Sequence, residues 1–329
     1  MVWLHRYIKL VAATTVLLIA AGGMVTSTDS GLAVPDWPNT YGHFMFSFPL
    51  EKMVGGIFYE HGHRMIASTV GFMTIILALW IWRVDARPWM RRLGFIALGA
   101  VILQGILGGI TVLYLLPAPV SIGHAGLAQI FFCLTIALSL FTSRSWREAR
   151  SPVDDPTLRR VALTATVLVY CQIVAGATMR HLEAGMAIPD FPLIFGGLLP
   201  PAWNLGVVAA FAHRVGAVLV TLAIAATVGH VWYHHRGRRE LMRPAAILLL
   251  LVLVQVTLGA YVIWTGLQPL VNTAHVVNGA LVLATSLVLT LRSERSRFAL
   301  EADATSARRA AAGPAASFGS GPVGSTTRA

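Results

Sequence analysis

The segment GLAVPDWPNTYG, residues 31–42, decides the fold of this chain because the chain contains it twice. The second copy is GMAIPDFPLIFG, residues 185–196, which shares Gly, Ala, Pro, Asp, Pro and Gly at the same positions. Proline lacks a backbone N–H and fixes its own φ, so the Pro-Asp-aromatic-Pro core ends a helix and favours a compact turn. We interpret each copy as a structural cap; a lid over a bound ligand is the alternative.

The similarity continues beyond this turn. HRMIASTVG at residue 63 matches HRVGAVLVT at residue 213, QGILGGITVL at 104 matches QVTLGAYVIW at 255, and IGHAGLAQI at 122 matches TAHVVNGAL at 273. The offset is 154 residues in the turn and 150 or 151 afterwards. The chain is therefore a tandem duplication, and its halves share one orientation because four membrane spans restore the starting side.

The composition is that of a membrane protein. Of the 329 residues, 56% are hydrophobic and only 12% are charged, about half the charge of a soluble domain. A helix crosses the hydrocarbon core with roughly 20 apolar residues, and no alternating pattern of a membrane barrel is present. We predict an all-α polytopic fold of two tandem pseudo-symmetric four-helix bundles. Its eight transmembrane helices cover about residues 8–26, 64–83, 93–114, 121–142, 159–179, 207–233, 244–265 and 271–291.

The net charge of +11 sets orientation rather than marking a nucleic-acid partner. Arginines gather before the first span, between alternate spans and after the last span, which is the positive-inside pattern. We expect a multi-pass protein of a prokaryotic inner membrane, in contact with membrane lipid, with both termini cytoplasmic. The first span is not interpreted as a signal peptide, because a matching span recurs later and no clear cleavage site follows it.

The repeat divides the chain into an N-terminal half, residues 1–150, and a C-terminal half, residues 151–298. Residues 299–329 are rich in Ala, Gly and Ser, which is typical of a disordered segment, here a cytoplasmic tail. Both cysteines, Cys133 and Cys171, fall inside spans and form no CxxC motif, so they predict neither a redox motif nor a loop disulfide.

Histidines at equivalent positions of the repeat are the candidate metal ligands. They are His63, His124, His213 and His275, two in each half and all near the outer face. A lone intramembrane histidine commonly bonds a neighbouring helix, but a pair per half, without a cysteine or carboxylate cluster, suits axial coordination of haem iron. Copper remains an alternative metal. The histidines without a histidine counterpart are not expected to be ligands. His61 is expected to be structural or peripheral, and the others to be solvated: His5, His43, His181, His230, His234 and His235.

Arginines Arg64 and Arg214 directly follow a candidate ligand in each half. Arginine binds carboxylates in a bidentate manner, so both are candidate partners of haem propionates. An arginine that snorkels to the membrane interface is the alternative.

The segments GGMVTSTDSGLAVPDWP, EHGHRM, LGGITVL and GHAGLAQ, with their echoes in the second half, resemble the haem A synthase family over about residues 8–291. The resemblance implies oxidation of the C8 methyl of haem O to a formyl group, for cytochrome oxidase biogenesis, by successive hydroxylations with water as the oxygen source. It implies a haem b cofactor on His213 and His275 in the C-terminal half. His63 and His124 then flank the substrate haem, and Glu60 occupies the family's active-site glutamate position.

The resemblance also implies partners, and this chain departs from the family pattern at one place. A haem O synthase is expected as a partner by pathway logic, together with an unidentified electron acceptor and a possible second copy of the chain. Many bacterial relatives carry a cysteine pair beside the Pro-Asp-Trp-Pro core, where Val34 and Thr40 stand here. A step that uses loop thiols is therefore not expected.

The duplication provides an internal control for Glu60. Its counterpart in the second half is Ala210, while the following histidine and arginine are kept. A generic helix-dipole role would serve both copies, so the difference favours proton transfer or water positioning by Glu60. A two-haem b electron-transfer protein explains four histidines but not this asymmetry, and a transporter or haem-handling protein is a third alternative.

Overall fold

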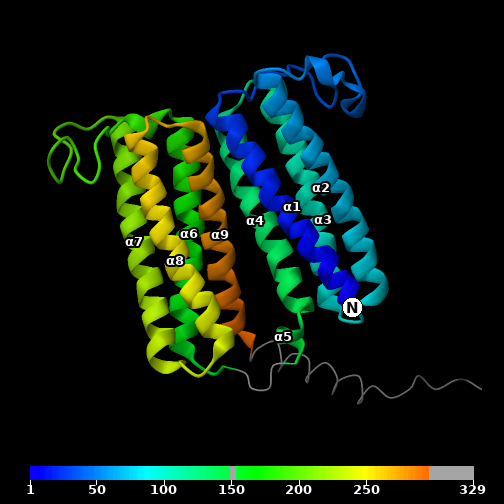
Figure 1. Ribbon diagram of the computed structural model, residues 1–329, viewed down its shortest axis with the longest axis vertical. Coiled ribbons are helices and arrows are strands. Elements are labelled where there is room, and N and C mark those ends of the chain that lie inside the picture. Colours follow the sequence, from blue (N-terminus) through cyan, green and yellow to red (C-terminus); the bar gives the residue numbers. More distant parts are fainter. Residues whose placement is uncertain (149–152, 296–329) are drawn as a thin grey trace, which may run out of the picture.

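The computed structural model describes residues 1–148 and 153–295, and within them the chain is helical without a β-strand. Eight helices there are long and apolar enough to cross a membrane, which confirms the predicted fold class. The predicted tail, residues 299–329, lies outside the described residues. The long helices are α1 (Val2–Ser27), α2 (Gly56–Val84), α3 (Pro88–Leu113), α4 (Ala118–Thr142), α6 (Pro156–His181), α7 (Leu205–His234), α8 (Arg239–Trp264) and α9 (Pro269–Ser293) (Figure 1). Short helical segments are η1 (Met45–Ser47), η2 (Leu50–Lys52), α5 (Arg144–Arg147) and η3 (Ala184–Met186).

Helix α2 begins at Gly56 rather than near residue 64, where its apolar run starts. The polar side chains of its first turns are buried against the preceding loop, so they find partners inside the protein and the helix extends through them. Proline at the first turn of α3, α6 and α9 fits the position where a helix needs no backbone N–H.

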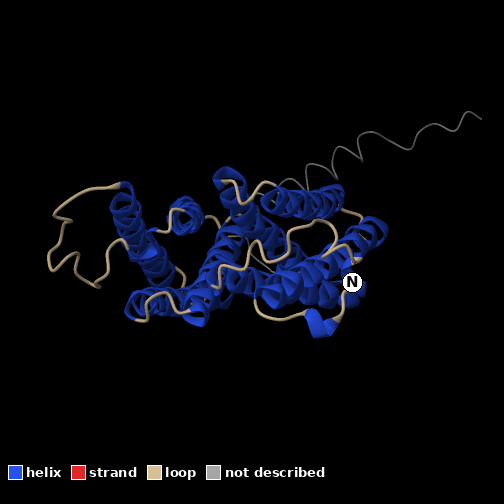
Figure 2. Cartoon of the chain, turned by 90° about the horizontal axis from the view of Figure 1, so that it is seen from above, coloured by secondary structure: helices blue, strands red, loops and turns tan. Residues whose placement is uncertain are grey.

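Figure 1 shows helices α1–α4 on one side of the molecule and α6–α9 on the other, and Figure 2 shows the same arrangement from above. Helix α1 packs on α2, α4 and α9, and α6 packs on α7, α9 and α4. One apolar cluster fills each half, and a third, made of Ile19, Phe132, Ala280 and Ala284, joins them. The packing therefore follows the sequence repeat.

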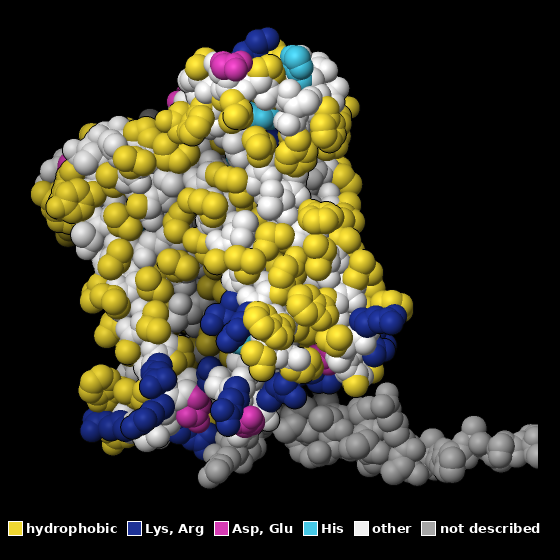
Figure 3. Space-filling model, turned by 45° about the vertical axis from the view of Figure 1, so that its right-hand side comes forward, with side chains coloured by type: hydrophobic (Ala, Val, Ile, Leu, Met, Phe, Trp, Pro, Cys, Tyr) yellow, Lys and Arg dark blue, Asp and Glu magenta, His cyan; other side chains and the backbone are white. Residues whose placement is uncertain are grey.

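The two ends of the molecule differ in charge. Arginines gather where α2, α4, α7 and α9 end, which we call the arginine end (Figure 3). The opposite end carries residues 28–55 and 182–204, and we call it the loop end. Polar contacts between the halves occur at this end, where Asn272 Nδ2 donates to Ser27 Oγ (3.0 Å) and Arg180 pairs with Asp29 (2.7 Å). At the arginine end, Arg292 donates to Ser145 Oγ across the halves (3.3 Å).

The repeated Pro-Asp-aromatic-Pro segment forms the predicted compact turn in both halves. Asp36 accepts the backbone N–H groups of Tyr41 and Gly42, each at 2.8 Å. Asp190 accepts those of Phe195 and Gly196 at the same 2.8 Å. The aspartate therefore closes the turn in each half.

Candidate functional site

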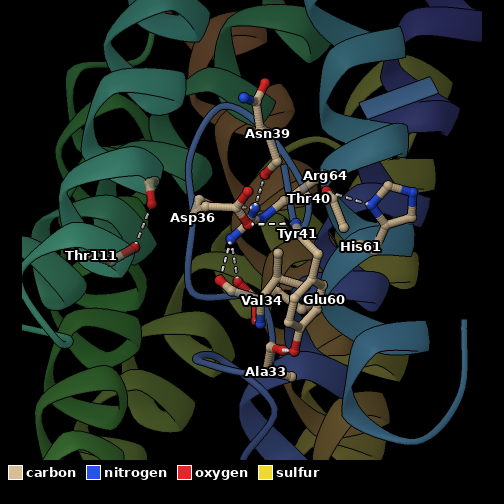
Figure 4. A network of polar contacts seen from close by, with 11 residues as sticks. Ala33, Val34, Asp36, Asn39, Thr40, Tyr41, Glu60, His61, Arg64 and Thr111 are labelled. Carbon is tan, nitrogen blue, oxygen red and sulfur yellow. Dashed lines mark hydrogen bonds and ion pairs between the residues drawn. The ribbon is translucent and has the colours of Figure 1, made fainter. Parts of the chain in front are cut away.

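An arginine fastens each turn to the helix that follows it. Arg64 donates from Nη1 to the carbonyls of Asp36 (2.7 Å) and Asn39 (3.0 Å), and from Nη2 to that of Val34 (2.9 Å) (Figure 4). Arg214 does the same in the second half. Its Nη2 donates to Ile188 O (2.9 Å) and its Nη1 to Leu193 O (3.0 Å), at the positions equivalent to Val34 and Asn39. Both arginines therefore hold the turn.

Glu60 belongs to this network in the first half only. Its Oε1 pairs with Arg64 Nη2 at 2.6 Å, and its Oε2 accepts the backbone N–H of Val34 at 2.8 Å. The residue is 4% exposed. Two fixed donors hold the carboxylate in place, yet each oxygen keeps a further lone pair that can accept a proton or a water hydrogen bond.

His61, next to Glu60, supports the same turn. Its Nδ1 lies 2.9 Å from Thr40 Oγ1, and both residues are fully buried. In the second half the equivalent residues are Phe211 and Ile194, which pack together with Ile188 and Ala210 in an apolar cluster. His61 thus has a structural contact, as the sequence comparison predicts.

The candidate ligand histidines lie on α2, α4, α7 and α9, two in each half. His63 and His124 are near enough for their charges to interact, and so are His213 and His275. Each ring packs against a glycine of a neighbouring helix, where an added Cβ would come within 2.9–3.4 Å of the imidazole. These glycines are Gly22, Gly108, Gly176 and Gly259. Gly22 is equivalent to Gly176 in the repeat, and Gly108 is equivalent to Gly259, so the contact between glycine and imidazole is found in both halves.

The two histidine pairs differ in what surrounds the rings. Buried Nδ1 atoms of His63 and His124 have no hydrogen-bond partner. In the second half, Gln172 Nε2 lies 3.0 Å from His213 Nδ1, and Gln255 Nε2 lies 3.3 Å from His275 Nδ1. Each amide nitrogen also donates to the backbone carbonyl of the same histidine, at 2.7 Å for His213 and 3.1 Å for His275. The second pair is therefore oriented by fixed partners.

These surroundings fit haem. Two imidazoles per half supply a bis-imidazole donor set, and a glycine lets each ring lie close against the neighbouring helix. The buried Nδ1 atoms of the first pair have no partner within the chain and are open to one from outside it. The glutamines suit the second pair to a permanent cofactor, because partners that orient a ligand strengthen metal binding.

The two arginines differ as candidate partners of a propionate. Arg64 is buried and already donates four hydrogen bonds, to three carbonyls and to Glu60. Arg214 is half-buried with two carbonyl partners and Phe191 beneath it. A guanidinium has five N–H donors, so Arg214 keeps more of them for a ligand. The role of both toward a propionate remains a prediction.

Sequence reasoning missed three kinds of residue here. The glycines could have been found, because Gly22 and Gly176, and Gly108 and Gly259, occupy equivalent positions. Gln172 carries no such signal, since Leu18 is its counterpart. His230 and His235 were expected to be solvated, which is wrong: both are partly buried and bond Asp155 at the arginine end.

The fold and the site define a class: a duplicated, all-helical protein with eight candidate membrane spans and a histidine pair in each half. The chain belongs to the cytochrome oxidase assembly protein family, whose model matches residues 5–288.

Relatives carry the name heme A synthase. The protein from Symbiobacterium thermophilum is 34% identical over 264 residues, which cover 76% of this chain and 82% of the relative. That from Geobacillus kaustophilus is 29% identical over 308 residues, covering 89% and 94%. That from Halalkalibacterium halodurans is 26% identical over 311 residues, covering 89% and 99%. The similarity therefore spans both halves of the duplication.

Proposed function

We propose that this protein converts haem O into haem A by oxidising the C8 methyl group to a formyl group. Membership of the cytochrome oxidase assembly protein family and relatives named heme A synthase support this activity. The observation that carries it is the asymmetry between the halves: a buried carboxylate, Glu60, lies three residues before His63 on α2, and Ala210 stands at the equivalent place before His213 on α7. A protein that only passed electrons would not need this difference.

The two halves take different haems in this proposal. Residues 1–150 bind the substrate haem O between His63 and His124, whose Nδ1 atoms have no hydrogen-bond partner within the chain. Residues 151–298 hold haem b on His213 and His275, whose rings contact Gln172 and Gln255. A substrate must leave after each turnover, whereas a cofactor stays, and the difference in ring support follows this distinction.

The reaction fixes what the residues must do. Conversion of a methyl to a formyl group consumes one water and releases four protons and four electrons to an acceptor. His63 and His124 position the substrate. Glu60 accepts protons or orients the attacking water with the lone pairs that Arg64 and Val34 leave free. Arg64 fixes the orientation of the Glu60 carboxylate through their ion pair and holds the turn through the carbonyl of Val34. When bound, haem b supplies a one-electron redox centre.

The membrane setting belongs to the same proposal. The arginine end faces the cytoplasm and the loop end faces outward, in agreement with the positive-inside rule. Both haem sites then lie near the outer face of a bacterial inner membrane. A haem O synthase supplies the substrate, and the electron acceptor is a separate component.

Analysis of the pigment tests this function. The full chain is produced in a host that makes haem O but lacks this activity, then purified in detergent, and its haems are extracted and separated by chromatography. Haem A together with haem O and haem b is the expected result. Haem b alone at two sites would overturn the proposal in favour of an electron-transfer protein.

A further inference from the structure

A second cluster of metal-binding side chains lies at the arginine end, far along the helices from the candidate haem ligands. Asp155 Oδ2 is 2.8 Å from His230 Nε2 and 2.8 Å from His235 Nε2. The ligand atoms of these three residues all lie within 4.8 Å of one another. Their side chains are only 14–17% exposed, so the cluster is not an ordinary solvated patch.

The fold brings these residues together where α6 begins and α7 ends. Asp155 is the N-cap of α6, where its Oδ1 accepts the backbone N–H of Leu158 (2.9 Å) and leaves Oδ2 free. His230 lies in the last turns of α7, and His235 is its C-cap. Because α6 and α7 pack against each other, the start of one meets the end of the other. Both imidazoles then point at a single carboxylate oxygen.

The cluster belongs to the second half alone. The first half has Met1, Trp80 and Asp85 at the equivalent positions, which cannot form the same ligand set. Neighbouring His234 provides an internal contrast: its ring packs on that of His230, with centroids 4.5 Å apart, but it is exposed and contributes no ligand atom to the cluster.

We propose that Asp155, His230 and His235 bind a divalent transition-metal ion of the zinc class. Zinc lies about 2.0–2.2 Å from nitrogen and oxygen ligands in a tetrahedron, so ligand atoms on one ion stand about 3.3–3.6 Å apart. The three ligand atoms here lie within 4.8 Å of one another, so a small opening of the two 2.8 Å contacts to Asp155 admits the ion. In the hydrogen-bonded state each Nε2 donates its proton to Asp155 Oδ2. On metal binding that proton leaves Nε2, the neutral ring carries its one proton on Nδ1, and the metal replaces the two hydrogen bonds to Asp155. Water completes the coordination.

The surroundings favour this class of ion over others. Hard cations such as Mg²⁺ and Ca²⁺ prefer an all-oxygen shell, whereas two imidazoles suit zinc and its neighbours. This end of the protein is also rich in arginine, so a cation held by charge alone would be repelled. The bound ion would clamp the start of α6 to the end of α7. The inference is independent of the haem chemistry proposed above.

The test uses the full chain with its haem, purified in detergent, treated with a chelator and dialysed against Zn²⁺ alone. Bound zinc is counted by elemental analysis. We expect one saturable zinc per chain and a rise in its thermal unfolding temperature. His230→Gln and His235→Gln should each weaken binding at least about tenfold, as loss of a metal-supporting group does.

Two further variants separate metal binding from structure. Asp155→Asn removes the carboxylate but keeps a good N-cap for α6, so it should lose zinc while its haem spectrum stays unchanged. His234→Gln is the matched control and should bind zinc like the natural chain. Absence of saturable zinc in the natural chain would overturn the site and leave a plain hydrogen-bonded clamp. Equal binding in His230→Gln and His234→Gln would overturn it as well.

Discussion

The two copies of the repeated turn share one set of aspartate and arginine contacts, which we call the frame, and they differ in the side chains that pack beneath the turn. Each copy has an aspartate that closes the turn and an arginine that holds two of its carbonyls at equivalent positions. Polar groups lie beneath the first copy: Glu60 forms an ion pair with Arg64, and His61 is hydrogen-bonded to Thr40. Beneath the second lies an apolar cluster that includes Ala210 and Ile194. The shared contacts therefore build the frame, and the polar set of the first copy calls for another explanation.

This difference matters because a buried charged pair is costly to keep. Desolvation offsets much of the attraction between Glu60 and Arg64, and an apolar replacement of such a pair is often neutral or stabilising. The second half shows that the frame holds without a carboxylate. Stability alone does not account for Glu60, which is consistent with the proposed catalytic role.

The largest expected effect separates the two histidine pairs. His213→Ala or His275→Ala should remove the low-spin bis-imidazole absorption of haem b, because an axial ligand is lost. His63→Ala is the matched variant in the first half and should leave that absorption in place. The measurement is the reduced optical spectrum of the purified protein. Retention of the signal in His213→Ala would place haem b elsewhere.

The next effect tests the polar set itself. Glu60→Gln keeps the size of the side chain and removes its charge, so formation of haem A should fall by about 10²-fold or more, the usual contribution of a general base. Haem b should remain bound. Chromatography of extracted haems measures the ratio of haem A to haem O.

Two controls accompany this variant. Glu51→Gln makes the same change at an exposed residue of the segment that precedes α2 and should leave conversion unchanged. Arg64→Lys tests whether Glu60 matters only through the turn, because lysine can still pair with Glu60 but cannot hold three carbonyls at once. An equal loss in Arg64→Lys and Glu60→Gln, or normal haem A in Glu60→Gln, would contradict a direct role for the carboxylate.

The repeat explains how much the sequence could predict. Eight spans, the compact turn and the positions of His63 and His213 follow from hydropathy and internal alignment, which are properties of the chain alone. Three of the four partners of Arg64 are backbone carbonyls, which carry no signature in the residue types. The cluster of Asp155 with His230 joins residues 75 positions apart, so only the packing of α6 on α7 reveals it.

A smaller effect is expected from the glutamine that supports His213. Gln172→Leu introduces the residue found at the equivalent position, Leu18, and leaves Nδ1 of His213 without a partner, as in His63. Haem b should still bind, but its affinity should fall by about 10–100-fold, since partners of a ligand histidine contribute this much. The rate of haem transfer to an excess of a haem-scavenging globin measures the loss. An unchanged rate would mean that ring support does not distinguish the two halves.

The smallest effect concerns the frame that both copies share. Backbone N–H groups of Gly196 and Phe195 lower the pKa of Asp190 below its ordinary value of 3.8. Burial pushes the pKa of Asp36 upward, but bonds from Gly42 and Tyr41 outweigh it, so that pKa is lowered too. A carboxyl with a lowered pKa in the folded state stabilises the fold above its ordinary pKa and loses this effect as the pH falls through the lowered value.

Both turns should therefore stay closed down to about pH 4, the ordinary pKa of aspartate, and open only below it. Hydrogen exchange at the four turn amides, corrected for the intrinsic effect of pH, measures this opening. Asp190→Asn is the control, because its amide does not titrate and its turn should exchange at a rate independent of pH, while the turn of Asp36 in the same molecule still responds. Opening of either turn near neutral pH would show that the aspartate is not what closes it, and the two copies would then share a sequence without sharing a mechanism of closure.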